Sequence, residues 1–327
     1  MRLNPLHRLI WSLFKKAAPL FEADKITQLL SSRACPEAER RFLHPLEFQE
    51  LQLSLDFWER PRGEKGKSPS HGSSLFSGLM TALASQGQIP EITKLIRCRV
   101  PAGKTTQGFS YRLEIRLHHS PECLYWVEVP NGDLIARLAA SRRKKIFIDV
   151  GAHIGSISIP ASFLFDEVFA LEPCGETHQQ LRKNIAMNER RNIQVHQAAA
   201  GAEEGNMVLT YAQGQSGGAS LIPEKNRRNQ EKVAVVTLDN LVHQKVDFLK
   251  VDSEGWDLEV LRGARRILHE DQPDLYLELG SKEAVEGLKD ILPPDYWVDQ
   301  RGGYKRFQDT WADLELLNDL FFTVKPD

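Results

Sequence analysis

Short apolar runs alternate with helix-like stretches in the part of the chain that begins at Lys145. Such runs predict strands, and their alternation with helices indicates βαβ units in a mainly parallel sheet. The predicted strands are Ile146 to Val150, Glu167 to Leu171, Ile193 to Gln197, Val246 to Val251 and Leu275 to Leu279. Helices are predicted over Glu176 to Asn188 and Leu258 to Leu268. The pattern therefore predicts an α/β fold.

Other β-rich runs do not fit this alternation. Met207 to Tyr211 and Val233 to Leu238 are predicted to form an inserted hairpin or edge strands, and the tail from Tyr296 to Val324 predicts further antiparallel strands. Tyr111 to Leu117 alternates as a strand does, with Tyr125 to Val129 as its candidate partner.

The N-terminal part has a different pattern. Residues 1 to about 58 have apolar spacing typical of helices, including Leu46 to Trp58, and residues 60–74 are rich in Pro, Gly, Ser and Lys, as flexible segments are. We therefore divide the chain into a mostly helical N-terminal extension, residues 1–100, and a catalytic domain, residues 101–327. The first helix could make weak contact with a membrane surface or a partner, although docking on its own protein is favoured.

Composition narrows the function classes. The 327 residues include 42 basic and 44 acidic ones, a balance that argues against a nucleic-acid partner. No apolar run reaches the roughly 18 residues of a membrane span. Cysteines 35, 98, 123 and 174 lie far apart, without the spacing of a metal or redox pair, so we expect a reduced, cytoplasmic protein. The oligomeric state cannot be predicted.

The most informative stretch is IFIDVGAHIGSISI, residues 146–159, where a buried strand runs into Gly151 and Gly155. A strand, a glycine turn and a helix N-terminus together present backbone N–H groups to a ligand. A dinucleotide-binding turn requires further glycines, but His153 and Ser156 stand at those positions. No phosphate-binding GxxxxGK[ST] loop follows a strand either, so the turn disfavours NAD and nucleoside triphosphates.

Acidic residues end the first two predicted strands. Asp149 could meet the cationic amino group of a ligand such as S-adenosylmethionine, where a phosphate would be repelled. Glu172 follows 23 residues later, at a strand end where a carboxylate can accept both hydroxyls of a ribose. This order favours an adenosyl cofactor with a positive charge.

Five segments carry a family resemblance: IFIDVGAHIG, VFALEP, TLDNL, VDFLKVDSEGWDLEVLRGA and PDLYLELG. In order and spacing they resemble the FkbM family of S-adenosylmethionine-dependent methyltransferases over about residues 145–280. The resemblance implies a Rossmann-like class I methyltransferase fold, S-adenosylmethionine as cofactor, and methyl transfer to a hydroxyl of a saccharide or related natural product. Expected cofactor contacts are Asp149, Gly151, Ala152, His153, Gly155, Glu172 and Asp252.

Two positions depart from the expected loop. The family usually has Asn where this chain has His153, whose imidazole we expect to substitute for the amide as a hydrogen-bonding group. Pro160 would break a helix that began directly after Gly155, so we expect the helix to begin late, with Ser158 as its cap.

Methyl transfer to a hydroxyl calls for a base beside the methyl group. Candidates at strand ends are Asp252, Glu254 and Glu278, with His153 as the runner-up. Asp252 shares a strand face with Lys250 and should reach the ligand crevice. Glu254 could instead cap the helix that begins near Trp256. No His pair has metal-ligand spacing, so no metal is predicted, although the carboxylates could hold Mg²⁺.

Two other functions remain open at this point. A nucleotide-sugar oxidoreductase would use NAD on a related fold, although the glycine turn disfavours it. A non-catalytic methyltransferase-like scaffold would bind a partner through its N-terminal helices. For the acceptor, the loop GQSGGAS, residues 214–220, is a candidate lid or sugar-facing wall.

Overall fold

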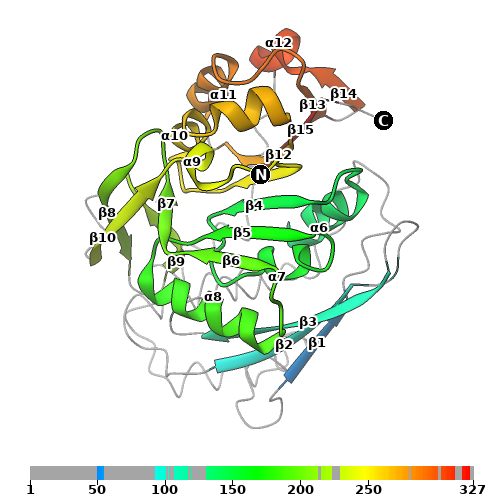
Figure 1. Cartoon of the computed structure of the whole chain (residues 1–327), viewed down its shortest axis with the longest axis vertical. Helices are drawn as coiled ribbons and strands as arrows, with labels where there is room; N and C mark the ends of the chain where they lie inside the picture. The colour runs from blue at the N-terminus through cyan, green and yellow to red at the C-terminus, as the bar shows by residue number, and fades with distance from the viewer. Residues whose placement is uncertain are drawn as a thin grey trace, which may run out of the picture.

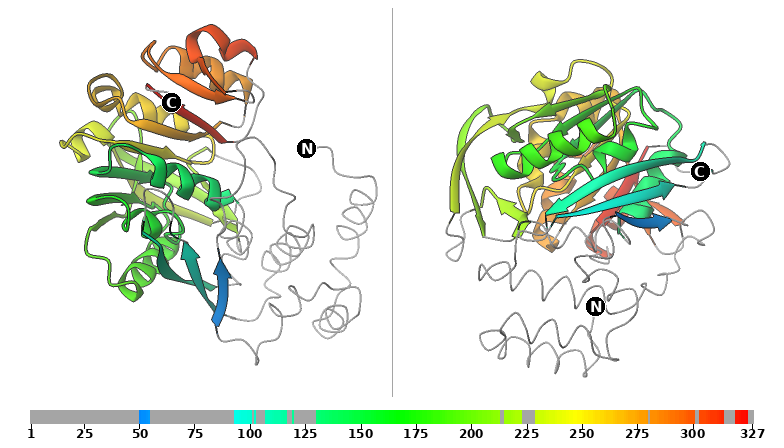
Figure 2. Two further views of the ribbon diagram at one scale, coloured as in Figure 1. Left: turned by 90° about the vertical axis from the view of Figure 1, so that its right-hand side faces the viewer. Right: turned by 90° about the horizontal axis from the view of Figure 1, so that it is seen from below.

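The computed structural model describes residues 50–54, 93–100, 102, 107–116, 119, 130–212, 215–222, 229–279, 281–300, 303–313 and 319–324. The predicted N-terminal helix, the segment 60–74 and the strand Tyr125 to Val129 lie outside these residues. Figures 1 and 2 show the arrangement of the described elements.

A sheet of eight strands forms the centre of the molecule, in the order β14-β13-β15-β12-β11-β4-β5-β6. The strands are β4 (Ile146–Val150), β5 (Glu167–Leu171), β6 (Ile193–His196), β11 (Phe248–Val251), β12 (Asp274–Glu278), β13 (Trp297–Gln300), β14 (Gly303–Arg306) and β15 (Asp319–Thr323). All five strands predicted for the parallel sheet are present, with ends that shift by no more than two residues.

Strand directions identify the architecture. The five strands from β6 to β12 pair in parallel, and the chain order reverses between β4 and β11. β15 pairs antiparallel with β12, and β13 and β14 add an antiparallel hairpin, as predicted for the tail. This is the expected Rossmann-like class I methyltransferase fold, a mainly parallel sheet with antiparallel C-terminal strands.

Helices cover both faces of this sheet. Their bounds are α6 (Pro130–Ala140), α7 (Ser158–Ala161), α8 (Gly175–Met187), α9 (Leu238–Leu241), α10 (Asp257–Arg262), α11 (Lys282–Lys289) and α12 (Phe307–Thr310), with a π-helical segment Ile267–Asp271 and a 3-10 turn Trp311–Asp313. Among the described residues, no helix is both long and apolar enough to cross a membrane.

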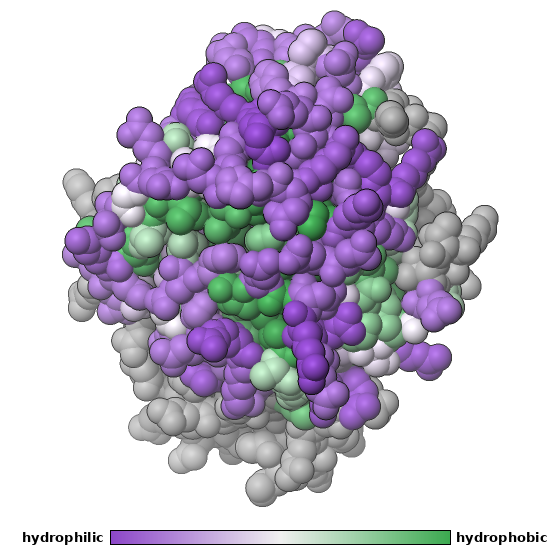
Figure 3. All heavy atoms as spheres, viewed as in Figure 1, coloured by the Kyte–Doolittle hydropathy of each residue, from purple (hydrophilic) through white to green (hydrophobic). Residues whose placement is uncertain are grey.

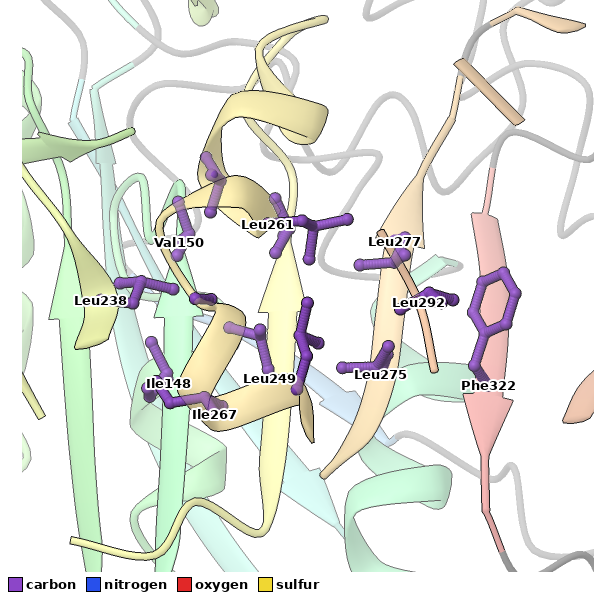
Figure 4. Close-up of a cluster of buried hydrophobic side chains, with 14 of the residues drawn as sticks. Ile148, Val150, Leu238, Leu249, Leu261, Ile267, Leu275, Leu277, Leu292 and Phe322 are labelled. Atoms are coloured by element: carbon purple, nitrogen blue, oxygen red, sulfur yellow. The ribbon is translucent and has the colours of Figure 1, made fainter. Parts of the chain in front are cut away.

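Alternation along the strands builds two separate cores. In β4, Phe147 points into one core with α6, α7 and α8, whereas Ile148 and Val150 point into the other with α9, α10 and α11. Figure 4 shows the second core, where Leu249 and Leu275 of neighbouring strands meet residues of the covering helices. Burial on both faces explains why these strands are continuous apolar runs.

A smaller sheet of four strands, in the order β7-β10-β8-β9, lies beside the main one (Figure 1). Its strands are β7 (Ala198–Ala200), β8 (Gly205–Ala212), β9 (Gln215–Ser220) and β10 (Asn229–Val236). β8 pairs antiparallel with β10 and with β9, which confirms the insertion predicted from the β-rich runs. The candidate acceptor loop is therefore mostly strand β9.

Strands β1 (Glu50–Ser54), β2 (Thr93–Val100) and β3 (Phe109–Arg116) form a third sheet, at the end of the molecule opposite α11 and the C-terminal strands (Figures 1 and 2). The predicted helix over Leu46 to Trp58 is wrong for Glu50–Ser54, because parallel pairing with β2 overrides the local propensity. The predicted domain boundary at residue 100 falls inside the β2–β3 hairpin.

The predicted helix Leu258 to Leu268 is interrupted. α10 ends at Arg262, and Gly263 packs so closely that an added Cβ would lie 2.0 Å from the carbonyl oxygen of Gly201. The chain then continues into the π-helical segment, which ends at Gln272 with a φ of 50°. A close backbone contact between the end of α10 and the residue after β7 thus coincides with a break in a stretch whose apolar periodicity indicates one helix.

Candidate active site

Acidic side chains gather at the carboxyl edge of the main sheet, on both sides of the point where the strand order reverses. Asp149 lies in β4, Glu172 follows β5, Asp252 follows β11, and Glu278 ends β12. In open α/β sheets ligands bind in the crevice at this point. The structure therefore brings the sequence-predicted carboxylates together in one place.

The glycine turn after β4 has a backbone that glycine alone accommodates well. Gly151 and Gly155 have φ values of 74° and 92°. A Cβ on Gly151 would lie 1.9 Å from the carbonyl oxygen of Asp252. The N–H groups of Gly151 and Ala152 both donate to the carbonyl of Leu171, at 3.1 and 2.9 Å. The turn is thus held against the ends of both neighbouring strands, β5 and β11.

The helix after the turn begins late, as predicted, but Ser158 does not cap it. α7 starts at Ser158 itself, and the side chain of its N-cap residue, Ile157, makes no capping hydrogen bond. Pro160 is then the third helical residue, where an N–H has no partner within the helix, so the proline is tolerated. The hydroxyl of Ser158 instead donates to Asp149, with an Oγ–Oδ2 distance of 2.5 Å.

Asp149 serves a cation of the protein itself. Its side chain is fully buried, and the Lys250 Nζ lies 3.2 Å from its Oδ1 atom. Strand register explains the pairing, because Lys250 of β11 stands directly opposite Asp149 of β4. The predicted direct contact between Asp149 and the amino group of a cofactor is corrected by this burial, since no surface of the carboxylate remains for an external cation.

Lys250 also reaches the crevice. Its Nζ lies 3.2 Å from Asp252 Oδ2 and donates to the carbonyl oxygens of Val150, at 3.3 Å, and Gly151, at 2.9 Å. Burial lowers the pKa of this amine, but the two carboxylates raise it by more, and the net pKa lies above the ordinary value. Lys250 is therefore a permanent cation, and the predicted shared face of Lys250 and Asp252 is confirmed.

Asp252 is the half-exposed partner, with 39% of its side chain accessible. Burial raises its pKa, but Lys250 and a hydrogen bond from Glu278 outweigh this effect, and the pKa is lowered. Oxygen atoms of Asp252, Glu254 and Glu278 all lie within 4.8 Å of one another. The crevice therefore gathers three carboxyl groups, of which Asp252 is kept ionised, and this suits a cationic ligand.

Glu254 stands in a strained turn at the crevice edge. It is exposed, with a φ of 53°, and Gly255 after it has a φ of 91°. The N-cap residue of α10 is Trp256, whose own side chain makes no capping hydrogen bond. The turn is fastened instead by Asp257, whose Oδ1 accepts from the backbone and hydroxyl of Ser253 at 3.0 and 2.9 Å.

Glu172 joins the glycine turn to the start of α8. The carboxylate is nearly buried, with 5% of the residue exposed, and it accepts from the backbone N–H groups of His153 and Cys174, each at 3.0 Å. Burial raises its pKa to about 7 against the opposing effect of these hydrogen bonds. Glu172 therefore changes charge near neutral pH.

His153 occupies a left-handed position in the turn, with a φ of 50°. Burial, followed by the neighbouring His119, lowers the pKa of its imidazole to about 3. A group with so low a pKa is neutral at pH 7 and accepts a proton weakly. This property weakens the prediction of His153 as the runner-up base and leaves it a neutral hydrogen-bonding residue.

The fold brings His119 and Lys250, neither of them predicted as a site residue, to the crevice. His119 is buried, its Nε2 atom lies 3.3 Å from Glu176 Oε2, and it is close enough to His153 to lower the pKa of that residue. Its position, more than 30 residues before the glycine turn, offered no signal. Lys250 did offer one, because a charged residue inside an otherwise apolar strand indicates a buried partner.

The small sheet reaches the crevice through the end of β9. Ser220 Oγ donates to the carbonyl of Glu254 at 2.9 Å, and Ile222 packs beside Gly255 while 41% of it stays exposed. Ile222 and Val208 are the exposed large hydrophobic residues of the described chain. In the view of Figure 3 apolar patches interrupt a mostly hydrophilic surface. An apolar side chain thus borders the acidic turn.

Residues 149–305 match the family model of the methyltransferase FkbM domain. The segment is a methyltransferase FkbM domain. It runs from Asp149, before the glycine turn, to Lys305 in β14, and so includes the acidic crevice and the small sheet.

Curated relatives of the FkbM domain are methyltransferases. "Methyltransferase 1" of Beauveria bassiana is 25% identical over 142 residues, which cover 36% of this chain and 57% of that protein. "Methyltransferase sdnD" of Sordaria araneosa is 24% identical over 152 residues, which cover 36% of this chain and 59% of that protein. The chain therefore matches less than two thirds of the length of either relative.

Among solved structures, the methyltransferase FkbM from Methylobacillus flagellatus KT is similar to this chain, with 21% identity and a TM-score of 0.39. The match covers 55% of this chain and 43% of that one. The strand order of the main sheet, rather than this likeness, identifies the fold described above.

The residues of the FkbM domain fit a sulfonium cofactor with a ribose. The acidic cluster after β11 and β12 suits a positive charge. Glu172 places a nearly buried carboxylate just after β5, the position at which a ribose is bound in such sheets. The same cluster has the oxygen ligands that a divalent cation accepts, but exposed acidic groups commonly gather without a metal. We assign no metal to it.

Proposed function

We propose that the chain is an S-adenosylmethionine-dependent methyltransferase that transfers a methyl group to a hydroxyl of a saccharide or related natural product. The observation that carries this proposal is the acidic crevice of the FkbM domain, where Asp252, Glu254 and Glu278 meet beside the glycine turn. A cationic cofactor is attracted there, whereas the phosphates of NAD would be repelled.

The cofactor, when bound, supplies a methyl group on a sulfonium centre. Glu172 holds the ribose hydroxyls, and the strained turn from Gly151 to Gly155 lets the backbone approach the ligand closely. Asp252, kept ionised by Lys250, supplies a negative charge at the crevice mouth. Positioning of the acceptor oxygen against the methyl carbon then supplies much of the rate, because displacement needs no covalent enzyme intermediate.

The acceptor hydroxyl loses its proton to a carboxylate. Asp252 has a lowered pKa and is therefore the weaker base of the pair. Glu254 is exposed, and one of its carboxylate oxygens lies within 4.8 Å of those of Asp252 and Glu278. We assign proton acceptance to Glu254 and orientation of the reactants to Asp252.

Calorimetric titration with S-adenosylmethionine and with NAD tests the cofactor assignment. Binding of the first and not the second is expected, and binding of NAD alone would refute the proposal. Glu172→Ala should lower cofactor affinity about tenfold or more through loss of a charge-assisted hydrogen bond. Glu286→Gln, an exposed carboxylate on α11, is the matched control and should bind as the wild type does.

Transfer of a labelled methyl group into a panel of glycans and hydroxylated natural products tests the reaction. With an accepted substrate, Glu254→Gln should lower kcat by roughly 100-fold or more and leave cofactor affinity nearly unchanged. Asp252→Asn should affect both quantities. Unchanged turnover in both variants would remove these carboxylates from the mechanism.

A further inference from the structure

A buried ammonium group connects the two elements that border the crevice. The Lys250 side chain is 8% exposed, and its Nζ lies between the carboxylates of Asp149 and Asp252. The same atom donates to the carbonyls of Val150 and Gly151, the residues at the end of β4 and the start of the glycine turn. One side chain of β11 thus holds four acceptors, three of them on the neighbouring strand and turn.

We propose that Lys250 is a positioning residue, which fixes the Gly151 carbonyl and the Asp252 carboxylate relative to each other where cofactor and acceptor meet. This inference rests on the proposed methyltransferase function and names a residue that acts through two others. It adds to that function the group that keeps the crevice in its binding geometry.

The geometry leaves little freedom for the turn without this amine. Gly151 has a left-handed backbone, and its Cα faces the carbonyl of Asp252 so closely that no Cβ fits between them. The peptide after Gly151 is therefore confined on one side by β11 and on the other by the hydrogen bond from Lys250. Removal of the amine frees the Gly151 carbonyl and separates it from Asp252.

A purely stabilising role does not explain a buried lysine well. Exchange of a buried ion pair for apolar residues of similar volume is often neutral or even stabilising, since desolvation offsets the attraction between the charges. The Asp149 side chain has no exposed surface. Among the described residues, the cation that pairs with it is Lys250. A lysine that is buried here in spite of its desolvation is better explained by the groups that it orients, the Gly151 carbonyl and the Asp252 carboxylate.

The charge of Asp252 depends on groups from every element around it. Lys250 of β11 and Glu278 of β12 lower its pKa, His153 of the glycine turn does so more weakly, and Asp257 of α10 adds negative charge nearby. Loss of Lys250 therefore raises the pKa of Asp252. Below that pKa the crevice loses a negative charge, and a cationic ligand binds less well.

The test compares Lys250→Met, an unbranched apolar replacement, with Lys245→Met, an exposed lysine just before β11. Affinity for S-adenosylmethionine is measured by calorimetry between pH 6 and pH 8.5. Relative to the control, Lys250→Met should bind about tenfold more weakly at pH 8.5, and the ratio should grow as the pH falls, because without Lys250 the pKa of Asp252 rises and its carboxylate takes up a proton at a higher pH.

If Lys250 had a merely structural role, the affinity ratio of Lys245→Met to Lys250→Met would be independent of pH, and that result overturns the inference. A ratio within twofold of unity also overturns it. If Lys250→Met does not fold, Asp252→Asn serves instead, because Asp252 is half exposed. It should weaken binding to the same extent at pH 8.5 and at pH 6, because the amide does not titrate, and equal affinity to the control at both pH values overturns the inference. Failure of wild type and Lys245→Met to bind would instead defeat the proposed function.

Discussion

Gly151→Ala should be strongly destabilising, and the structure separates the two causes. The new Cβ would lie 1.9 Å from the carbonyl oxygen of Asp252, a backbone atom that cannot rotate away. Such overpacking costs about 1–3 kcal/mol. The φ of 74° adds about 1–2 kcal/mol for a residue with a Cβ. The expected loss in free energy of unfolding is therefore about 2–5 kcal/mol.

Gly303→Ala is the matched control, because Gly303 has a φ of 111° but no heavy atom within 4 Å of an added Cβ. It should cost about 1–2 kcal/mol for the backbone alone. Urea unfolding followed by circular dichroism gives both values, and the difference measures the close approach of β4 to β11. Equal losses for Gly151→Ala and Gly303→Ala would show that this approach is not rigid and that the clash with Asp252 costs nothing.

Three further changes have defined outcomes. Asp247→Ala should cost about 1–3 kcal/mol in urea unfolding, because the buried Asp247 accepts at its Oδ2 from the N–H of Lys145 at 2.7 Å. A loss below about 0.5 kcal/mol would contradict this value. Glu172→Gln should make the free energy of unfolding depend less on pH. The pKa of Glu172 is about 7 in the folded protein and 4.5 ordinarily, so the native state binds more protons between these values. In the wild type the free energy of unfolding therefore falls as the pH rises from 4.5 to 7. His153→Asn should leave cofactor affinity within about threefold, since Asn tolerates a positive φ and supplies hydrogen bonds; a larger loss would show a specific need for imidazole.

Sequence alone predicted the parallel sheet well because its strands are buried on both faces. Phe147 and Ile148 enter different cores, so every position in β4 except Asp149 is apolar and the run stands out. Glycine residues and strand-end acids then located the crevice. The helix predicted over residues 46–58 failed at β1, because a short amphipathic stretch suits either structure and its partner, β2, lies about 40 residues away.

The roles within the site depended on pairings that spacing does not encode. Asp149 ends a strand as a ligand-binding acid would, yet register sets it against Lys250, and its charge is satisfied within the protein. His119 approaches the site from a segment outside the FkbM match. Such contacts join residues 30 to 100 positions apart, and the alternation of apolar and polar residues carries no information on them.

The acidic turn after β11 is held from two sides, and this separates its tasks. Lys250 fixes Asp252 from the main sheet, whereas Ser220, at the end of β9, holds the carbonyl of Glu254 from the small sheet. Ile222 borders the same turn and is exposed. Because the cofactor residues belong to the main sheet, changes in the small sheet should alter the position of Glu254 and the surface offered to an acceptor more than they alter cofactor binding. On the proposed function, the main sheet would thus bind the cofactor and the small sheet would select the acceptor.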